Sequence, residues 1–128
     1  MPINETLIRL VLAALLGAGV GWERQRADKP IGIRTLALVS MGAALFTLIG
    51  ILFTDEIHGP SRMAANVITG LGFLGAGVIF STGSEPRGLT TAALIWFTGA
   101  VGIAVGAGFW ELGLAGAVLA VLFLRLRT

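Results

Sequence analysis

Cysteine is absent from this chain of 128 residues, and histidine occurs once, as His58. The first absence excludes disulfides and thiolate metal centres, and one histidine cannot supply the ligand cluster of a zinc site. Charged side chains are also scarce, at 12% of the residues. The sequence shows no nucleophile–base pair and no cofactor motif. We therefore expect no enzymatic activity, no bound metal or cofactor, and no nucleic-acid partner.

What the chain has in excess is apolar surface, because 55% of its residues are hydrophobic and its mean hydropathy is +0.91. A soluble domain of this size cannot bury so much apolar surface. The N-terminus lacks the basic segment of a signal peptide, so the first apolar run is interpreted as a spanning helix. Five segments are apolar and about long enough to cross a lipid bilayer, namely Thr6–Trp22, Thr35–Phe53, Met63–Phe80, Leu89–Ala107 and Phe109–Leu124. The predicted fold is an all-α, polytopic membrane protein with one transmembrane domain over residues 1–128.

Basic residues fall unevenly between the predicted spans. With five spans, one side of the membrane carries Arg24, Arg26, Lys29, Arg34, Arg87, Arg125 and Arg127. The opposite side carries Asp55, Glu56, His58, Arg62 and Glu111. Loops rich in arginine and lysine stay on the cytoplasmic side. The sequence therefore predicts an external N-terminus and a cytoplasmic C-terminus.

Two pairs of predicted helices share a sequence pattern. Gly17–Val20 and Gly75–Val78 both read GAGV, and the pattern PxG[I/L]xT follows each of them, over Pro30–Thr35 and Pro86–Thr91. The similarity is either chance in a chain rich in glycine and alanine, or a parallel repeat of the kind that transporters use. A repeat would place the two pairs side by side with the same direction through the membrane.

Thr35 and Thr91 occupy matching positions near the starts of the second and fourth predicted helices. One interpretation is that each threonine caps the free N–H groups of its helix. The other is that two helix N-termini face each other, each with partial positive charge. Such an arrangement would suit an anion or a carboxylate from a partner.

Glycine is frequent in the predicted helices, although it costs about 1 kcal/mol relative to alanine in a helix interior. In lipid, small residues at four-residue spacing let helix backbones approach closely. The third predicted helix is therefore expected to be buried. The glycines expected to pack against other helices are Gly17, Gly21, Gly70, Gly72, Gly75 and Gly77. Their neighbours belong to the same chain or to a second copy, so we expect a homodimer or another homo-oligomer.

Few polar side chains lie near the predicted spans. Glu23 is either a solvated helix end paired with a nearby arginine, or part of a network between the two cytoplasmic turns. Arg34 enters the membrane and needs a partner at that depth. Asn66, with Arg62 one turn before it, either hydrogen-bonds between helices or lines a pathway. Mg²⁺ prefers oxygen ligands, and the absence of Asp and Glu inside the spans argues against a Mg²⁺ conduit formed by this chain alone.

Four ordered blocks of the sequence resemble the signature of the MgtC/SapB family. They are GWERQ at residues 21–25, GIRTLALV at 32–39, RMAANVITGLGFLGAGVI at 62–79 and RGLTTAALIW at 87–96. The resemblance implies a multi-pass protein of the bacterial inner membrane, linked to growth in low magnesium and to virulence. It also implies a regulatory role, including restraint of ATP synthase as a membrane partner, in place of direct Mg²⁺ transport.

The resemblance carries a set of functional polar residues over to this chain. Family members often have asparagine at the Thr90 position and glutamine at the Asn66 position, and both positions stay polar here. Many members continue into a soluble cytoplasmic domain, which a chain ending at Thr128 is expected to lack, either as a short member or as the membrane part of a longer protein. Together with the polar residues discussed above, the predicted functional network is Glu23, Arg24, Arg34, Thr35, Arg62, Asn66, Arg87, Thr90 and Thr91.

The sequence favours a membrane regulator of magnesium homeostasis that acts through partner proteins. The main alternative is a transporter of Mg²⁺ or of another small ion or solute, built on the helix-pair repeat. In that case Arg34, Asn66, Thr90 and Thr91 would lie near the pathway. A purely structural membrane scaffold is a third interpretation.

Overall fold

The protein is described by a computed structural model over residues 2–29, 31–53, 59–81 and 88–126. Within these ranges the chain forms α-helices and no strand. The helices are α1 (Ile3–Arg26), α2 (Ile33–Phe53), α3 (Gly59–Ser81), α4 (Leu89–Gly106) and α5 (Trp110–Leu124). The first four are long and apolar enough to cross a membrane, and α5 is shorter, with 15 residues. The predicted all-α class with five helices is confirmed.

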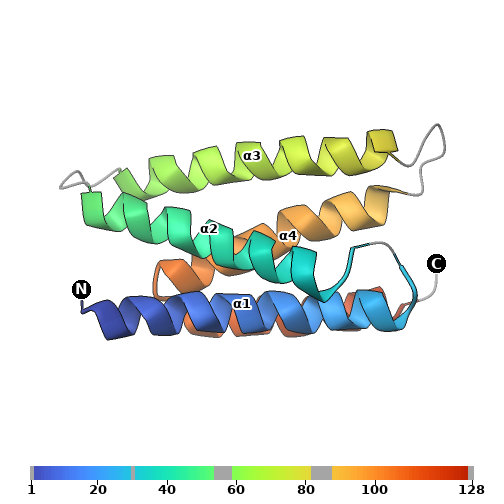
Figure 1. The fold of residues 1–128 in the computed structure, drawn as a ribbon, viewed down its shortest axis with the longest axis horizontal. Helices are drawn as coiled ribbons and strands as arrows, with labels where there is room; N and C mark the ends of the chain where they lie inside the picture. The colour runs from blue at the N-terminus through green and yellow to red at the C-terminus, as the bar shows by residue number, and fades with distance from the viewer. Residues whose placement is uncertain (1, 30, 54–58, 82–87, 127–128) are drawn as a thin grey trace.

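Consecutive helices run in opposite directions along the bundle (Figure 1). The helices α1, α3 and α5 start at the end that holds the N-terminus, and α2 and α4 run back toward it. The other end is called the basic end here, because its described side chains include Arg24, Arg26, Lys29, Arg34 and Arg125. The helix order thus gathers most of the basic residues at one end. The side of the membrane that this end faces stays a prediction.

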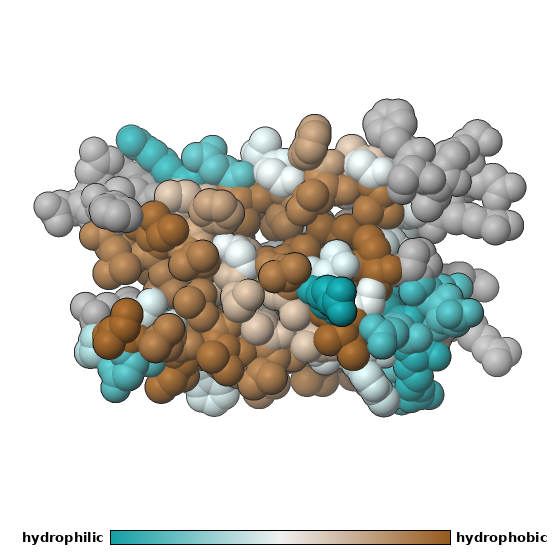
Figure 2. Space-filling model, viewed as in Figure 1, coloured by the Kyte–Doolittle hydropathy of each residue, from teal (hydrophilic) through white to brown (hydrophobic). Residues whose placement is uncertain are grey.

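The surface between the two ends is largely apolar (Figure 2). Brown residues form a band across the middle of the bundle, and hydrophilic residues gather toward its ends and along the first part of the outer edge of α3. Large apolar side chains such as Leu7, Leu15, Phe73 and Leu122 are more than half exposed. A surface of this kind matches the hydrocarbon interior of a bilayer, where exposing apolar side chains carries no cost.

Two short connections determine where helices end. The turn after α1 contains Asp28 and Ile31, whose φ angles are 57° and 65°, and α2 begins at Ile33. The helices α4 and α5 are joined by residues 107–109, where Gly108 has a φ of 97°. Glycine adopts this left-handed conformation without a steric penalty. The sequence placed the boundary between the fourth and fifth helices at this position, and the structure confirms it.

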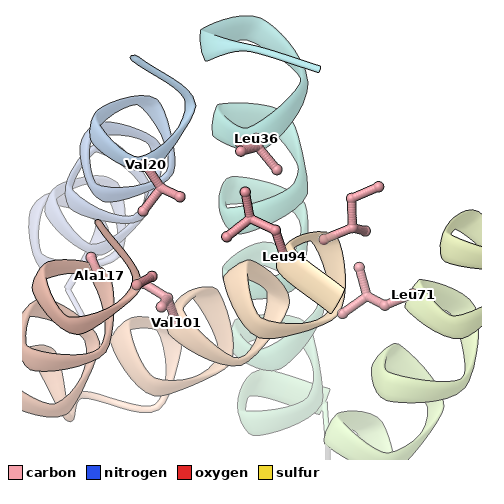
Figure 3. Packing of buried hydrophobic residues seen from close by; sticks show 8 residues of the cluster. Val20, Leu36, Leu71, Leu94, Val101 and Ala117 are labelled. Carbon is pink, nitrogen blue, oxygen red and sulfur yellow. The ribbon is translucent and has the colours of Figure 1, made fainter. Parts of the chain in front are cut away.

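The helix α4 lies at the centre of the bundle and contacts each of the other four helices. Val20 of α1, Leu36 of α2 and Leu94 of α4 are buried and point toward one another (Figure 3). On other sides of α4, Leu71 approaches from α3 and Ala117 from α5. Among the four long helices, α4 buries the largest share of its residues. Its neighbours therefore hold both of its ends in place.

Glycines allow α2 to pack closely against α1 and α4. A Cβ atom added at Gly21 would lie 2.5 Å from the Gly32 carbonyl oxygen, and one at Gly106 would lie 2.7 Å from that of Ala44. A Cβ at Gly17 would overlap the Leu36 carbonyl in the same way. These contacts leave no room for a larger side chain, so the glycines of α1 and α4 serve close backbone packing.

The expectation that the third helix is buried is wrong for the single chain. Gly70, Gly72 and Gly77 are exposed, and a Cβ at any of them would have no heavy atom within 4 Å. Gly75 is buried, and its added Cβ would lie 3.4 Å from that of Ala92. The reason is that α3 lies at the edge of the bundle and contacts α2 and α4 with one face. Packing of the other glycines against a second copy stays a prediction.

The two helix pairs repeat one glycine contact. Gly17 approaches Leu36 in the pair α1–α2, and Gly75 approaches Ala92 in the pair α3–α4. These residues occupy the same places in the shared sequence pattern, since Leu36 follows Thr35 and Ala92 follows the matching threonine. Both pairs also run in the same sense along the bundle (Figure 1). The pattern therefore corresponds to a shared packing arrangement, and that supports the interpretation as a parallel repeat.

Candidate functional site

Two oppositely charged neighbours, Glu23 and Arg24, are buried at the end of α1. Each is only 7% exposed. The helix continues past Trp22 to Arg26, so it carries both side chains along its last turn and into contact with other helices. Buried charges are costly unless they are hydrogen-bonded. The partners of these two residues therefore define the candidate site.

Each of the two charges contacts a different helix. Arg24 Nη2 donates a hydrogen bond to Thr91 Oγ1 in the first turn of α4. The Glu23 carboxylate accepts one from Arg125, which directly follows α5, with 3.3 Å between Oε2 and Nη2. The site therefore joins the ends of α1 and α5 to the start of α4. Two predicted functional residues, Arg24 and Thr91, are in direct contact.

The partner of Glu23 differs from every arginine that the sequence analysis considered for it. Arg34 is exposed, and Arg26 stacks over the Trp22 ring with its Cζ 5.5 Å from the ring centre. Arg125 lies 102 residues away along the chain. No local spacing pattern connects residues so far apart, so only the fold could reveal this ion pair.

The capping prediction is wrong for Thr91. The residue before α4 is Gly88, which has no side-chain capping bond, and the Thr91 hydroxyl accepts from Arg24. At the start of α2, the N–H of Ile33 donates instead to Gln25 Oε1 at 3.3 Å. Thr35 is exposed. Gln25, and not Thr35, therefore caps the start of α2.

The other predicted site residues do not join this cluster. Thr90 is exposed in the first turn of α4. Arg62 and Asn66 are exposed in the first half of α3, which begins at the end opposite the basic end. Asn66 lines an apolar groove of about 440 Å³ between α2 and α3, together with Phe46 and Met63. Arg87 lies outside the described residues.

Buried hydroxyl groups form a feature that the sequence analysis missed. Ser40, Thr47 and Thr98 are each at most 2% exposed, as is Thr91. Thr47 donates to the Ala43 carbonyl at 2.7 Å, whereas Ser40 Oγ and Thr98 Oγ1 have no hydrogen-bond partner among the described residues. Ser40 and Thr47 are seven residues apart in α2, as are Thr91 and Thr98 in α4, and this spacing puts the two hydroxyls of each helix on one face. The spacing was the only sign of this feature in the sequence.

Arg9 holds the opposite end of α4. Its Nη1 donates to the Gly106 carbonyl at 2.9 Å, and its Nη2 pairs with Glu5 at 3.0 Å. A cation at the C-terminal end of a helix is favourable, because the unsatisfied carbonyls there carry partial negative charge. Two arginines of α1 therefore contact the two ends of α4.

The described residues contain no group of three or more His, Asp or Glu side chains that could hold a metal ion. The described charged residues at the basic end are two carboxylates, Glu23 and Asp28, and several cations. This excess of positive charge is suited to binding anionic groups or to fixing helix ends.

The chain is similar to several bacterial proteins. It is 44% identical over 128 residues to "Putative magnesium transporter YhiD" of Escherichia coli strain K12, covering 94% of this chain and 60% of that protein. It is 44% identical to protein SrpB of Synechococcus elongatus, over 91% of this chain and 71% of the relative. It is 45% identical to protein MgtC of Brucella abortus, over 84% and 44%. No solved structure matches the chain.

The chain spans about 60% of the length of the Escherichia coli relative and less than half of the Brucella protein. The family model described as the MgtC family matches residues 10–128, which include most of α1, all of the other four helices and the charged cluster at the basic end. By this match and by its helices, the chain is a membrane-spanning member of the MgtC family.

Proposed function

We propose that this chain takes part in Mg²⁺ handling in the bacterial inner membrane as a regulator that acts by binding other membrane subunits. Family membership and the name of the Escherichia coli relative support the link to magnesium. The observation that carries the regulatory role is the exposed face of α3. This face supports a regulator that binds other membrane proteins, because a helix left incompletely packed at membrane depth can accept a partner helix.

The exposed face of α3 contains groups that lipid does not satisfy. Asn66 and Thr69 are exposed, and the Thr69 hydroxyl donates to the Ala65 carbonyl of its own helix at 3.1 Å. The Asn66 amide has no such bond to the described residues. In hydrocarbon an amide gains from a hydrogen bond across a helix interface. Gly70 lies one turn after Asn66 on the same side of the helix and leaves space for another backbone to approach. Together these features favour a second helix on this face.

A second copy of this chain is the partner that the α3 face fits best. Around a twofold axis, the same face of two α3 helices would bring an amide opposite an amide and small residues opposite small residues. The resulting homodimer would present the basic end of each chain to further partners. The membrane sector of ATP synthase, which the family resemblance implies, is proposed as one of them.

A Mg²⁺ conduit gains less support from the chain. Mg²⁺ gives up its water shell reluctantly and binds to carboxylates and other oxygen ligands. Glu5 and Glu23 lie near opposite ends of α1 and both already pair with arginine. Within the described helices no carboxylate cluster faces a cavity. These facts favour regulation over transport.

The transporter alternative rests on the groove beside Asn66 and on the name of the Escherichia coli relative. Mg²⁺ uptake into vesicles reconstituted with purified protein separates the two functions. We expect no uptake above that of protein-free vesicles. Saturable uptake that is abolished by Asn66→Leu would contradict the regulatory proposal and support transport.

A second experiment tests the α3 face itself. Gly70→Leu adds a side chain beside Asn66 where a Cβ meets nothing within 4 Å, so the monomer should fold normally. We expect this substitution to reduce self-association and the regulatory effect in cells. Gly19→Leu is the matched control, because Gly19 is also exposed and also open at its Cβ, but lies on α1. Equal effects of the two substitutions would count against the α3 face.

A further inference from the structure

The two arginines that contact α4 differ in their electrostatic setting. Arg9 donates to a carbonyl at the C-terminal end, where partial negative charge favours a cation. Arg24 instead contacts Thr91 in the first turn, where the free N–H groups carry partial positive charge. A cation and a helix N-terminus therefore face each other at the basic end. This pairing is unfavourable unless a negative group lies between them.

The positive charge of Arg24 is not matched by the described residues around it. The side chain is 7% exposed, and its Nε is buried with no hydrogen-bond partner in the part of the chain that the structure describes. The adjacent carboxylate, that of Glu23, is bonded to Arg125. A buried guanidinium without a counter-ion carries a large desolvation cost. An incoming anion would offset this cost and would also satisfy N–H groups of α4.

We propose that Arg24 and the first turn of α4 bind a phosphate group. The available donors are a guanidinium, the hydroxyls of Thr90 and Thr91, and the first N–H groups of α4. Because the Thr91 oxygen accepts from Arg24, its own hydrogen can be donated to an anion. Donors converging from several directions fit a tetrahedral oxyanion better than a planar carboxylate, and helix N-termini with arginine are recurrent phosphate ligands.

The position of the site suggests where the phosphate comes from. The helix α1 has 24 residues, which corresponds to roughly 36 Å at about 1.5 Å per residue, against about 30 Å of hydrocarbon. Arg24 near its end therefore lies at the depth of lipid headgroups. Leu89 and Thr90 are exposed and give access to the first turn of α4. Both a lipid phosphate and free inorganic phosphate can reach it. The inference goes beyond the proposed function and does not depend on it.

The first test uses inorganic phosphate and the purified chain in dodecyl maltoside, a detergent without phosphate. We expect saturable binding near one phosphate per chain by equilibrium dialysis. Because it removes a charge-assisted hydrogen bond to the anion, Arg24→Gln should weaken binding about tenfold or more. Arg26→Gln is the matched control, since it removes the same charge from an exposed residue two positions away.

A second arm distinguishes the two sources of phosphate. Native mass spectrometry of protein incubated with phosphatidylglycerol, or with diacylglycerol that lacks the phosphate, shows which lipid stays bound. If the lipid is the source, phosphatidylglycerol is retained by the wild type, is lost with Arg24→Gln, and competes with inorganic phosphate. If free phosphate is the source, inorganic phosphate binds and neither lipid is retained.

Several results would overturn the proposal. Equal binding by the wild type and Arg24→Gln would do so, as would acetate binding as tight as phosphate binding, which would indicate a carboxylate partner. If Arg24→Gln does not fold, Thr91→Val is compared with Thr98→Val, and only the first should weaken phosphate binding. Should these variants also fail to fold, the wild type alone decides, because the proposal fails if phosphate raises its melting temperature no more than chloride at equal ionic strength.

Discussion

At the scale of single residues, the last turn of α1 shows how a membrane helix can keep two opposite charges that do not pair with each other. Glu23 and Arg24 are consecutive, so their side chains leave the helix in directions about 100° apart. One therefore reaches Arg125 and the other reaches Thr91. The two contacts tie three helices together at the basic end. Neither contact is local in sequence.

Thr91→Val should destabilise the protein because it removes the hydroxyl that Arg24 contacts. Leaving a buried donor unsatisfied costs about 1–3 kcal/mol. Thr35→Val is the matched control, since Thr35 holds the equivalent position in the sequence pattern but is exposed, and such changes stay within about 0.5 kcal/mol. The free energy of unfolding in mixed micelles checks both. Equal losses for the two variants would contradict the role given to the hydroxyl.

The sequence identified part of this site and missed the rest for a physical reason. Glu23 stood out as a carboxylate near a helix core, Thr91 through the repeated PxG[I/L]xT pattern, and Arg24 through the resemblance to the MgtC/SapB family. Arg125 was recognised only as a positive charge near the C-terminus. Its distance from Glu23 along the chain means that only tertiary packing brings them together. The capping role of Gln25 was likewise hidden, because it depends on the path of the turn before α2.

At the scale of helices, glycine has two different uses in this protein. On α1, Gly17 faces the backbone of α2, whereas Gly19, two residues later, meets nothing within 4 Å. On α3, only the face with Leu71 and Gly75 is buried. Glycine spacing predicts that a helix can be approached closely. It does not say whether the approaching helix belongs to the same chain, and for that reason α3 was expected to be buried.

Alanine substitutions on α1 test this distinction. Gly17→Ala should destabilise the protein by about 1–3 kcal/mol, because overpacking forces the α1 and α2 backbones apart. Gly19→Ala should be neutral or stabilising by up to about 1 kcal/mol, since alanine favours the helix and meets open space. Unfolding in mixed micelles measures both changes. If Gly17→Ala proved harmless, the close contact between α1 and α2 would be wrong.

At the scale of the whole molecule, the helix pairs α1–α2 and α3–α4 run in the same sense, and α4 packs against all its neighbours. The order and approximate bounds of the helices could be predicted from hydropathy alone, because an apolar run long enough to cross a bilayer has few other stable forms. Their arrangement around α4 could not, since hydropathy does not specify neighbours. The helix α3 lies at the edge of the bundle, and of the four long helices it has the smallest share of its residues buried within the single chain.

The absence of native cysteine makes the predicted orientation simple to test. Single cysteines at Lys29 and Glu111 lie near opposite ends of the bundle, and both residues are exposed. With the basic end in the cytoplasm, a membrane-impermeant maleimide should label Glu111→Cys in intact spheroplasts and Lys29→Cys only after permeabilisation. The reverse pattern would show that the basic end faces outward.

The exposed face of α3 is proposed to bind a second copy of the chain. Oxidative cross-linking of Gly70→Cys in native membranes tests this proposal most directly, with Gly19→Cys as the matched position on α1, since both glycines are open at their Cβ atoms. We expect a disulfide-linked dimer for Gly70→Cys and essentially none for Gly19→Cys. A monomer at both positions, or equal cross-linking at both, would contradict it.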